Sequence, residues 1–269
     1  MIHTRFKHNE VCREISAEAC AGCAHPAPGP LRTRLSAWSV NKLRRETAQA
    51  FANRKTLFVS QCLRDNFQRT MPDANLSRTQ VVHNFVDYSR IRDIAAGVEA
   101  QASEQLEVLI VGAIYGAKGI GSFLEALSRR HVPHLRVSII GQGEDLPKLR
   151  AQFEGAGVRF LGGQGYQEVI RATVASDAVV VPSILEEPCA TTVLEGLALG
   201  KPVYALKRGG APELATYERY PDQLRLFDRM EDLASSLVKL DTKTPMRLYD
   251  EFAGDVRNCV SRIIKIYKQ

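Results

Sequence analysis

The feature that most constrains this chain is a regular alternation of short apolar runs and helical runs after residue 106. The run L-E-V-L-I-V-G at 106–112 precedes a helical pattern at 118–130, and the run 135–141 precedes another at about 145–155. Further apolar runs lie at 158–162, 178–182, 202–206 and 224–227, with helices expected at 166–175, 191–199 and 231–240. Such alternation predicts an α/β fold with a Rossmann-like parallel sheet and helices on both faces.

The residues before this region predict a smaller, separate unit. Residues 31–55 have the composition of a basic amphipathic helix. A buried strand is expected at 56–60, a helix at about 61–69 and a second strand at 81–87. We expect a connector at 88–105, because these residues are rich in Ala, Glu and Gln.

Ligands of open parallel sheets bind outside the carboxyl ends of the strands, so the loops after the strands are the candidate sites. In V-G-A-I-Y-G-A-K-G at 111–119, Gly112 allows close backbone approach and Lys118 supplies a positive charge for a phosphate. The alternative is an ordinary strand–helix turn with a surface lysine. The loop G-Q-G-E-D-L at 141–146 has the same form, and there a helix-capping role is favoured.

The most informative loop is P-S-I-L-E-E-P-C-A-T-T-V-L-E-G-L-A-L-G-K-P-V at 182–203. Glu187 precedes a helix that is expected to begin at Ala190 or Thr191, and the free N–H groups of Thr191 and Thr192 could bind phosphate there. Glu195 lies one turn inside this helix among apolar residues, where a carboxylate must be paired or functional. The alternative is that Glu187 only complements the helix dipole.

The ordered set of these motifs resembles the group 1 family of retaining glycosyltransferases. It comprises V-G-x5-K-G, G-x-G, V-x-F-L-G, P-S-x-x-E-E-P-x5-L-E-G-x-A-x-G-K-P-V and G-G-x-P-E, within residues 106–213. The resemblance implies a GT-B fold, in which two Rossmann-like domains face each other and the C-terminal one holds the nucleotide sugar. The boundaries it implies are 1–88 for a remnant of the acceptor domain, 89–105 for a linker, 106–242 for the nucleotide-sugar domain and 243–269 for C-terminal helices.

The resemblance also implies a role for each matching residue. Lys118 would bind the donor diphosphate and act in catalysis, Glu187 would touch the donor sugar, and Glu195 would hold the ribose hydroxyls. Gly112 and the backbone amides of Ala190, Thr191 and Thr192 would complete the donor site. Neither a cofactor nor a metal is expected, because the family uses protein cations for the departing diphosphate and treats the nucleotide sugar as substrate.

The sequence departs from the family pattern in two respects. Ala113 stands where the family usually has an arginine, which removes one diphosphate cation, and Arg208 is a candidate substitute. A complete first domain would also need far more residues before 56. We therefore expect an N-terminally truncated chain, with a fragment that only binds the nucleotide sugar, or half of a split enzyme, as the alternatives.

The first 60 residues carry ten Lys/Arg and four Glu, so the formal charge of +6 resides there. Peripheral membrane contact through residues 31–55 is one interpretation, and a solvated basic face is the other. Cys12, Cys20 and Cys23 could form a zinc site, although their spacing is irregular, and a structural cysteine insert is the alternative. A nucleic-acid-binding module would have the charge but lacks a reading motif, so no nucleic acid is expected.

The resemblance therefore implies a hexosyltransferase-type enzyme that transfers a sugar with retention from a nucleotide-diphosphate donor to a glycan or lipid-linked acceptor. Polysaccharide biosynthesis is the process that the resemblance implies. A nucleotide-sugar epimerase is a less favoured alternative. A cytoplasmic location is expected, since no apolar stretch suits a signal peptide or a membrane span.

Overall fold

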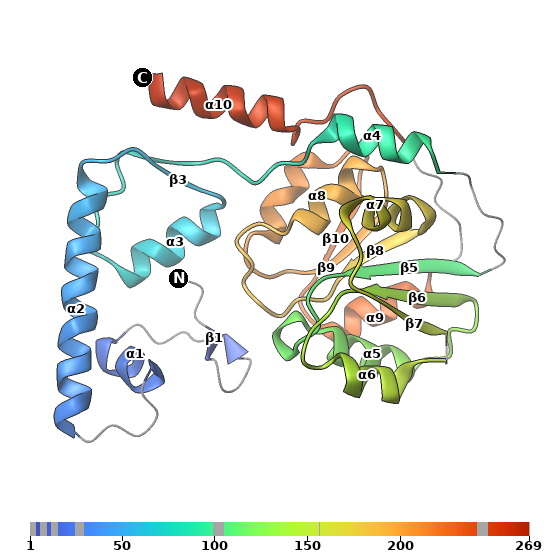
Figure 1. The fold of residues 1–269 in the computed structure, drawn as a ribbon, viewed down its shortest axis with the longest axis horizontal. Helices are drawn as coiled ribbons and strands as arrows, with labels where there is room; N and C mark the ends of the chain where they lie inside the picture. Colours follow the sequence, from blue (N-terminus) through green and yellow to red (C-terminus); the bar gives the residue numbers. More distant parts are fainter. Residues whose placement is uncertain are drawn as a thin grey trace.

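The computed structural model describes residues 4–5, 10–11, 16–24, 30–98, 105–155, 157–240 and 247–268. Its main body is a six-stranded, wholly parallel sheet with the order β10-β9-β8-β5-β6-β7 (Figure 1). The strands are β5 (Leu106–Val111), β6 (Leu135–Ile140), β7 (Val158–Gly162), β8 (Ala178–Val181), β9 (Val203–Leu206) and β10 (Leu224–Phe227). The chain runs outward from β5 to β7 and then returns to β8, so the strand order reverses between β5 and β8. A crevice is expected at such a switch point.

Helices cover both faces of this sheet (Figure 1). One face carries α5 (Ile120–Ser128), α6 (Leu146–Phe153) and α9 (Met230–Val238), and the other carries α4 (Tyr88–Ala96), α7 (Tyr166–Ala175) and α8 (Thr191–Ala198). The α/β class and the two-faced parallel sheet predicted from the sequence are thereby confirmed.

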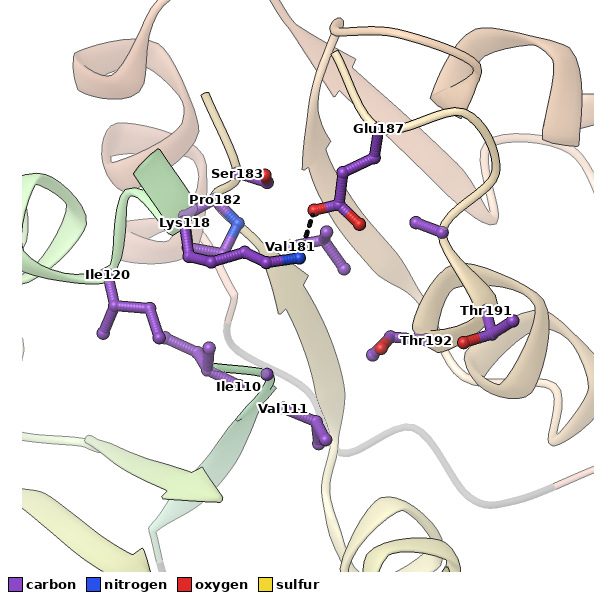
Figure 2. Close-up of a pocket in the computed structure, with 12 residues that line it drawn as sticks. Ile110, Val111, Lys118, Ile120, Val181, Pro182, Ser183, Glu187, Thr191 and Thr192 are labelled. Atoms are coloured by element: carbon purple, nitrogen blue, oxygen red, sulfur yellow. Dashed lines mark hydrogen bonds and ion pairs between the residues drawn. The ribbon is translucent and has the colours of Figure 1, made fainter. Parts of the chain in front are cut away.

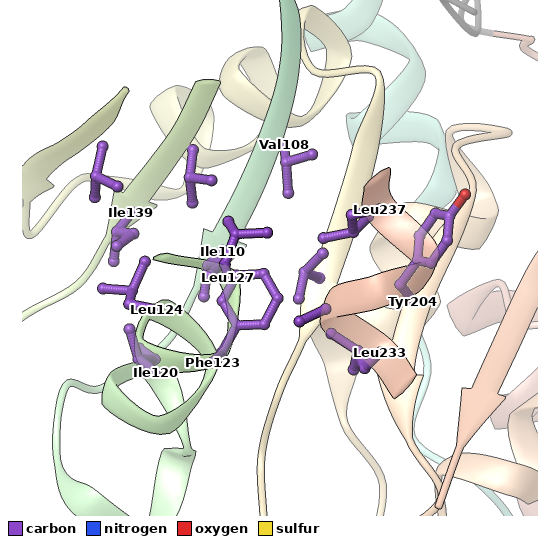
Figure 3. Packing of buried hydrophobic residues seen from close by; sticks show 14 of the residues in the cluster. Val108, Ile110, Ile120, Phe123, Leu124, Leu127, Ile139, Tyr204, Leu233 and Leu237 are labelled. Atoms are coloured by element: carbon purple, nitrogen blue, oxygen red, sulfur yellow. The ribbon is translucent and has the colours of Figure 1, made fainter. Parts of the chain in front are cut away.

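Alternating strand residues divide the core into two layers. Val108 and Ile110 of β5 pack with Phe123 of α5 and Leu233 of α9 (Figure 3). On the opposite face, residues such as Val179 and Val203 pack with α7 and α8. Each fully buried side chain of this size contributes about 1.5–3 kcal/mol, so burial on both faces explains why the strands are almost entirely apolar.

The smaller unit precedes α4. It contains β1 (Thr4–Arg5), β2 (Glu10–Val11), α1 (Ala17–Ala24), α2 (Pro30–Ala52), β3 (Thr56–Phe58), α3 (Gln61–Thr70) and β4 (Thr79–Val81). Strands β3 and β4 form a short parallel pair, and Phe51, Phe58 and Phe67 pack together beside it. The last helix, α10 (Val256–Lys268), contacts this unit, because Lys55 Nζ donates to the carbonyl oxygen of Ile266 at 2.9 Å.

The structure differs from the sequence expectation in the stretch interpreted as a connector. The described part of 89–105 begins within α4, whose Tyr88, Ile91 and Ala95 are buried against the main body. Asp87 caps this helix by accepting from the backbone N–H of Arg90. The polar composition concealed the helical spacing of these three residues.

Two further elements differ in extent. The strand expected at 81–87 is β4 (Thr79–Val81) followed by a single bridge from Val86 to Asp255. Within 243–269, the described residues contain one helix, α10, rather than several. No helix in the described ranges combines the length and the apolar composition needed to cross a membrane.

Candidate functional site

A pocket of about 140 Å³ lies at the switch point, where β5 and β8 end (Figure 2). Six of the seven residues predicted for the site line it, namely Gly112, Lys118, Glu187, Ala190, Thr191 and Thr192, and Glu195 does not. The remaining lining residues are Ile110, Val111, Ile120, Val181, Pro182 and Ser183. The fold therefore brings together side chains from three separate loops.

One wall of the pocket is formed by the turn that carries Lys118. This residue ends the 3₁₀ helix η1 (Gly116–Lys118), and α5 begins two residues later, so Lys118 precedes the helix in which it was expected. Gly119 has φ +70°, and a Cβ there would lie 2.1 Å from the carbonyl oxygen of Pro182. The backbone N–H groups of Ile184 and Leu185 donate to the carbonyl oxygen of Ala117 at 3.1 and 3.2 Å. These hydrogen bonds hold the turn that carries Lys118 against the loop after β8.

Lys118 and Glu187 form an ion pair across the pocket. The distance from Lys118 Nζ to Glu187 Oε1 is 2.9 Å, and the two side chains are 23% and 24% exposed (Figure 2). Partial burial strengthens the attraction between the charges but also removes part of their hydration. The pair therefore holds both groups at the pocket while leaving them accessible to a ligand.

The backbone of Glu187 is supported by the loop after β9. Gly210 N–H donates to the carbonyl oxygen of Glu187 at 2.8 Å. Gly209 has φ +54°, and a Cβ there would lie 2.3 Å from the same oxygen. Glycine is therefore required by both the dihedral angle and the close approach.

Glu213, in the 3₁₀ helix η2 (Ala211–Tyr217), connects this loop to the smaller unit. Its carboxylate accepts the backbone N–H groups of Gln61 and Cys62, at 2.7 and 2.8 Å, at the start of α3. His83 Nε2 lies 3.2 Å from Glu213 Oε2. The carboxylate thereby caps α3 from a distant part of the chain, which the sequence pattern G-G-x-P-E did not indicate.

The opposite wall is the N-terminus of α8. Its N-cap residue is Ala190, which has no polar side chain, and no side-chain hydrogen bond caps this helix among the described residues. Thr191 and Thr192 follow on the first turn and line the pocket. Uncapped N–H groups and the positive end of the helix dipole favour an anion at this wall.

Glu195 points to a neighbouring region. It is partly buried on α8, and burial raises the pKa of its carboxyl to about 7. The pKa of Tyr166, at the start of α7, is raised to about 12, first by burial and second by the negative charge of Glu195. The carboxyl therefore lies near the start of α7. It is not one of the residues that line the pocket with Lys118.

Arg208 does not replace the arginine that the family usually has at the position of Ala113. Its guanidinium donates to the carbonyl oxygens of Lys207 and Asp228, both at 3.0 Å, and it is absent from the pocket lining. Within the described ranges, Lys118 is the only cationic side chain that borders the pocket. The structure thus leaves one lysine and a helix N-terminus to meet an anion.

The predicted zinc site lies only partly within the described residues. Cys12 and the side chain of Cys23 lie outside the described residues, while Cys20 is half-buried and is 3.5 Å from Arg44 Nη2. The described residues contain no cluster of His, Cys, Asp and Glu suited to a metal. Zinc binding by the three cysteines stays a prediction.

Comparison with known proteins shows which family the region around this site is similar to. Residues 91–220, which include every pocket residue, match the sequence model described as "Glycosyl transferases group 1". Within these residues the chain is similar to the group 1 glycosyltransferases. The match begins within α4, in agreement with the packing of that helix on the main body.

Two curated relatives are similar to this chain. The "Uncharacterized glycosyltransferase MJ1069" of Methanocaldococcus jannaschii is 23% identical over 194 residues, which cover 64% of this chain and 49% of the relative. The "Sulfoquinovosyl transferase SQD2" of Arabidopsis thaliana is 35% identical over 144 residues, which cover 52% of this chain and 27% of the relative. The chain thus spans about half or less of the length of these relatives.

Solved structures show the same fold. A HepE protein of Anabaena, in complex with UDP and glucose, matches with a TM-score of 0.58 at 22% identity, over 75% of this chain and 57% of that one. A glycosyltransferase from Rickettsia africae matches with a TM-score of 0.63 at 15% identity, over 94% of this chain and 80% of that one. These similarities support a GT-B fold.

Proposed function

We propose that this protein binds a nucleoside-diphosphate sugar in the switch-point pocket and transfers its sugar to a glycan or lipid-linked acceptor, with retention of anomeric configuration. The observation that carries the proposal is the Lys118–Glu187 pair, held at 2.9 Å opposite the uncapped N-terminus of α8. The pocket thereby offers two sources of positive potential for a diphosphate and one carboxylate for sugar hydroxyls. The UDP, glucose complex of the similar HepE structure supports a nucleotide sugar as the ligand class.

The proposed reaction follows from these charges. The bond between the anomeric carbon and the diphosphate oxygen breaks, and the electron pair leaves with the diphosphate. The acceptor hydroxyl forms the new bond on the same face of the sugar, and its proton passes to the departing diphosphate. Lys118 and the α8 N-terminus stabilise the negative charge that develops on the leaving group, which lowers the barrier.

Glu187 and Glu195 have different proposed roles. When the donor binds, Lys118 turns from Glu187 towards the diphosphate. The carboxylate of Glu187 then accepts hydrogen bonds from the sugar hydroxyls. Glu195 accepts hydrogen bonds from the ribose hydroxyls.

Ligand-dependent stability tests the donor site. Wild type is heated with UDP, GDP, ADP and their common sugars, beside Lys118→Ala and the exposed control Lys148→Ala. A ligand at a hundred times its dissociation constant adds about 2.7 kcal/mol to the folded state. We expect one nucleotide to stabilise wild type and Lys148→Ala but not Lys118→Ala. The proposal is wrong if no nucleotide stabilises wild type.

Transfer is measured separately from binding. Purified protein is incubated with a donor labelled in the sugar and with glycan or lipid-linked acceptors, and the products are separated by mass and anomeric configuration. Label on the acceptor, in the anomeric configuration of the donor, supports the transferase. Binding without product identifies a nucleotide-sugar-binding protein, and conversion of the donor to its epimer identifies an epimerase.

The exposed face of α2 supports a further part of the proposal, peripheral contact with a membrane. Leu35, Trp38 and Leu43 are each more than half exposed, and Lys42 Nζ lies 5.6 Å from the centre of the Trp38 ring. Apolar side chains beside cationic ones suit the surface of an anionic bilayer. Co-sedimentation with vesicles of anionic lipid, compared with vesicles of neutral lipid, tests this contact.

A further inference from the structure

The hydroxyl of Ser183 is buried at the pocket without a partner. Ser183 is 7% exposed, and its Oγ makes no hydrogen bond to any of the described residues. The residue lines the pocket and lies beside Lys118 in the close-up view (Figure 2). A buried hydroxyl without a partner destabilises the folded state, so the folded state alone gives no reason for serine at this position.

The backbone around Ser183 fixes the position of this hydroxyl before any ligand arrives. Strand β8 ends at Val181, and the carbonyl oxygen of Pro182 packs against Gly119. The two N–H groups that follow Ser183 both donate to the carbonyl oxygen of Ala117. The hydroxyl is therefore attached to the same rigid wall as Lys118, and it requires little reorganisation to meet a ligand.

The surroundings of the hydroxyl favour an anionic ligand group. The ammonium of Lys118 and the N-terminus of α8 both attract negative charge to this pocket. A hydroxyl that donates to a phosphate oxygen forms a charge-assisted hydrogen bond, which is about twice as strong as a neutral one. We propose that Ser183 is a donor-binding residue whose Oγ–H donates to the diphosphate of the nucleotide sugar. This inference rests on the proposed donor site.

The substitution Ser183→Ala separates a ligand contact from a structural role. We expect about tenfold weaker binding of UDP, GDP or ADP, whichever binds wild type most tightly, measured by titration calorimetry. The ligand-free variant should unfold at the same denaturant concentration as wild type or a higher one, because no hydrogen bond is lost. Its own unfolding curve also shows that the variant is folded.

Ser138→Ala is the matched control. Ser138 is a buried serine of β6 outside the pocket lining, and its hydroxyl is hydrogen-bonded to Glu107 and Arg159. This control should lose stability and keep the wild-type affinity for the nucleoside diphosphate, which is the opposite of the result expected for Ser183→Ala.

Three results would overturn the inference. Unchanged affinity of Ser183→Ala would remove the ligand contact while leaving the donor site intact. A loss confined to the nucleotide sugar, with the nucleoside diphosphate bound as in wild type, would assign the hydroxyl to the sugar instead. Failure of wild type to bind any of the three nucleoside diphosphates would reject the donor site itself and the Ser183 contact with it.

Discussion

Replacing Glu195 by Gln should stabilise the ligand-free protein at alkaline pH. Burial raises the pKa of this carboxyl from 4.5 to about 7, so the folded state binds its proton more tightly than the unfolded state. Stability contributed by this group is therefore highest below pH 4.5, falls as the pH rises through 7, and is lowest above it. Each pKa unit corresponds to 1.36 kcal/mol, which gives a penalty of about 3 kcal/mol at pH 8.

Glutamine resembles the protonated carboxyl and does not bear this penalty. We expect Glu195→Gln to exceed wild type by up to about 3 kcal/mol in free energy of unfolding at pH 8. The difference should decrease towards pH 5. Urea unfolding at both pH values measures it, with the exposed Glu144→Gln as the control for loss of a charge. The same variant should bind the donor nucleotide more weakly, because a carboxylate accepts ribose hydroxyls better than an amide does.

Higher stability together with weaker nucleotide binding would indicate that the carboxylate of Glu195 serves ligand binding and not folding. A variant that is no more stable than wild type at pH 8, or whose advantage is the same at both pH values, would refute the reasoning. It would show that Glu195 is adequately solvated or paired in the folded state. The ribose role would then have no electrostatic support.

Two further substitutions test the framework of the site. Glu213→Ala should lower the free energy of unfolding by about 2 kcal/mol and speed hydrogen exchange of the first two amides of α3, because they lose a charged acceptor; unchanged exchange, as in the control Glu144→Ala, would contradict the capping role. Gly119→Ala should lower the free energy of unfolding by at least 2 kcal/mol in urea, because the added Cβ meets Pro182 at a positive φ. Gly97→Ala, at an unstrained position, should cost less, and equal losses would show that the close approach is not restrictive.

Much of the fold is specified by local patterns. Apolar runs separated by helical runs predicted the parallel sheet, because strands buried on both faces must be apolar throughout. The same patterns placed Lys118 and Glu187 in loops at the carboxyl ends of strands, and the structure brings them into contact. The stretch at 88–98 was not predicted as helix, because its burial depends on contacts with α7 that its own composition does not reveal.

The sequence by itself determined the order of the elements, the loops that carry the site and the glycines that these loops require. Only the tertiary structure decided how the side chains pair. Arg208 could have faced the pocket but binds backbone carbonyl oxygens instead, and Glu195 lies near Tyr166, outside the residues that line the pocket. Ser183 is an unremarkable residue in the sequence, and its significance comes from burial without a partner. The physical reason is that periodicity is encoded within a few residues, whereas solvation and charge pairing depend on segments far apart along the chain.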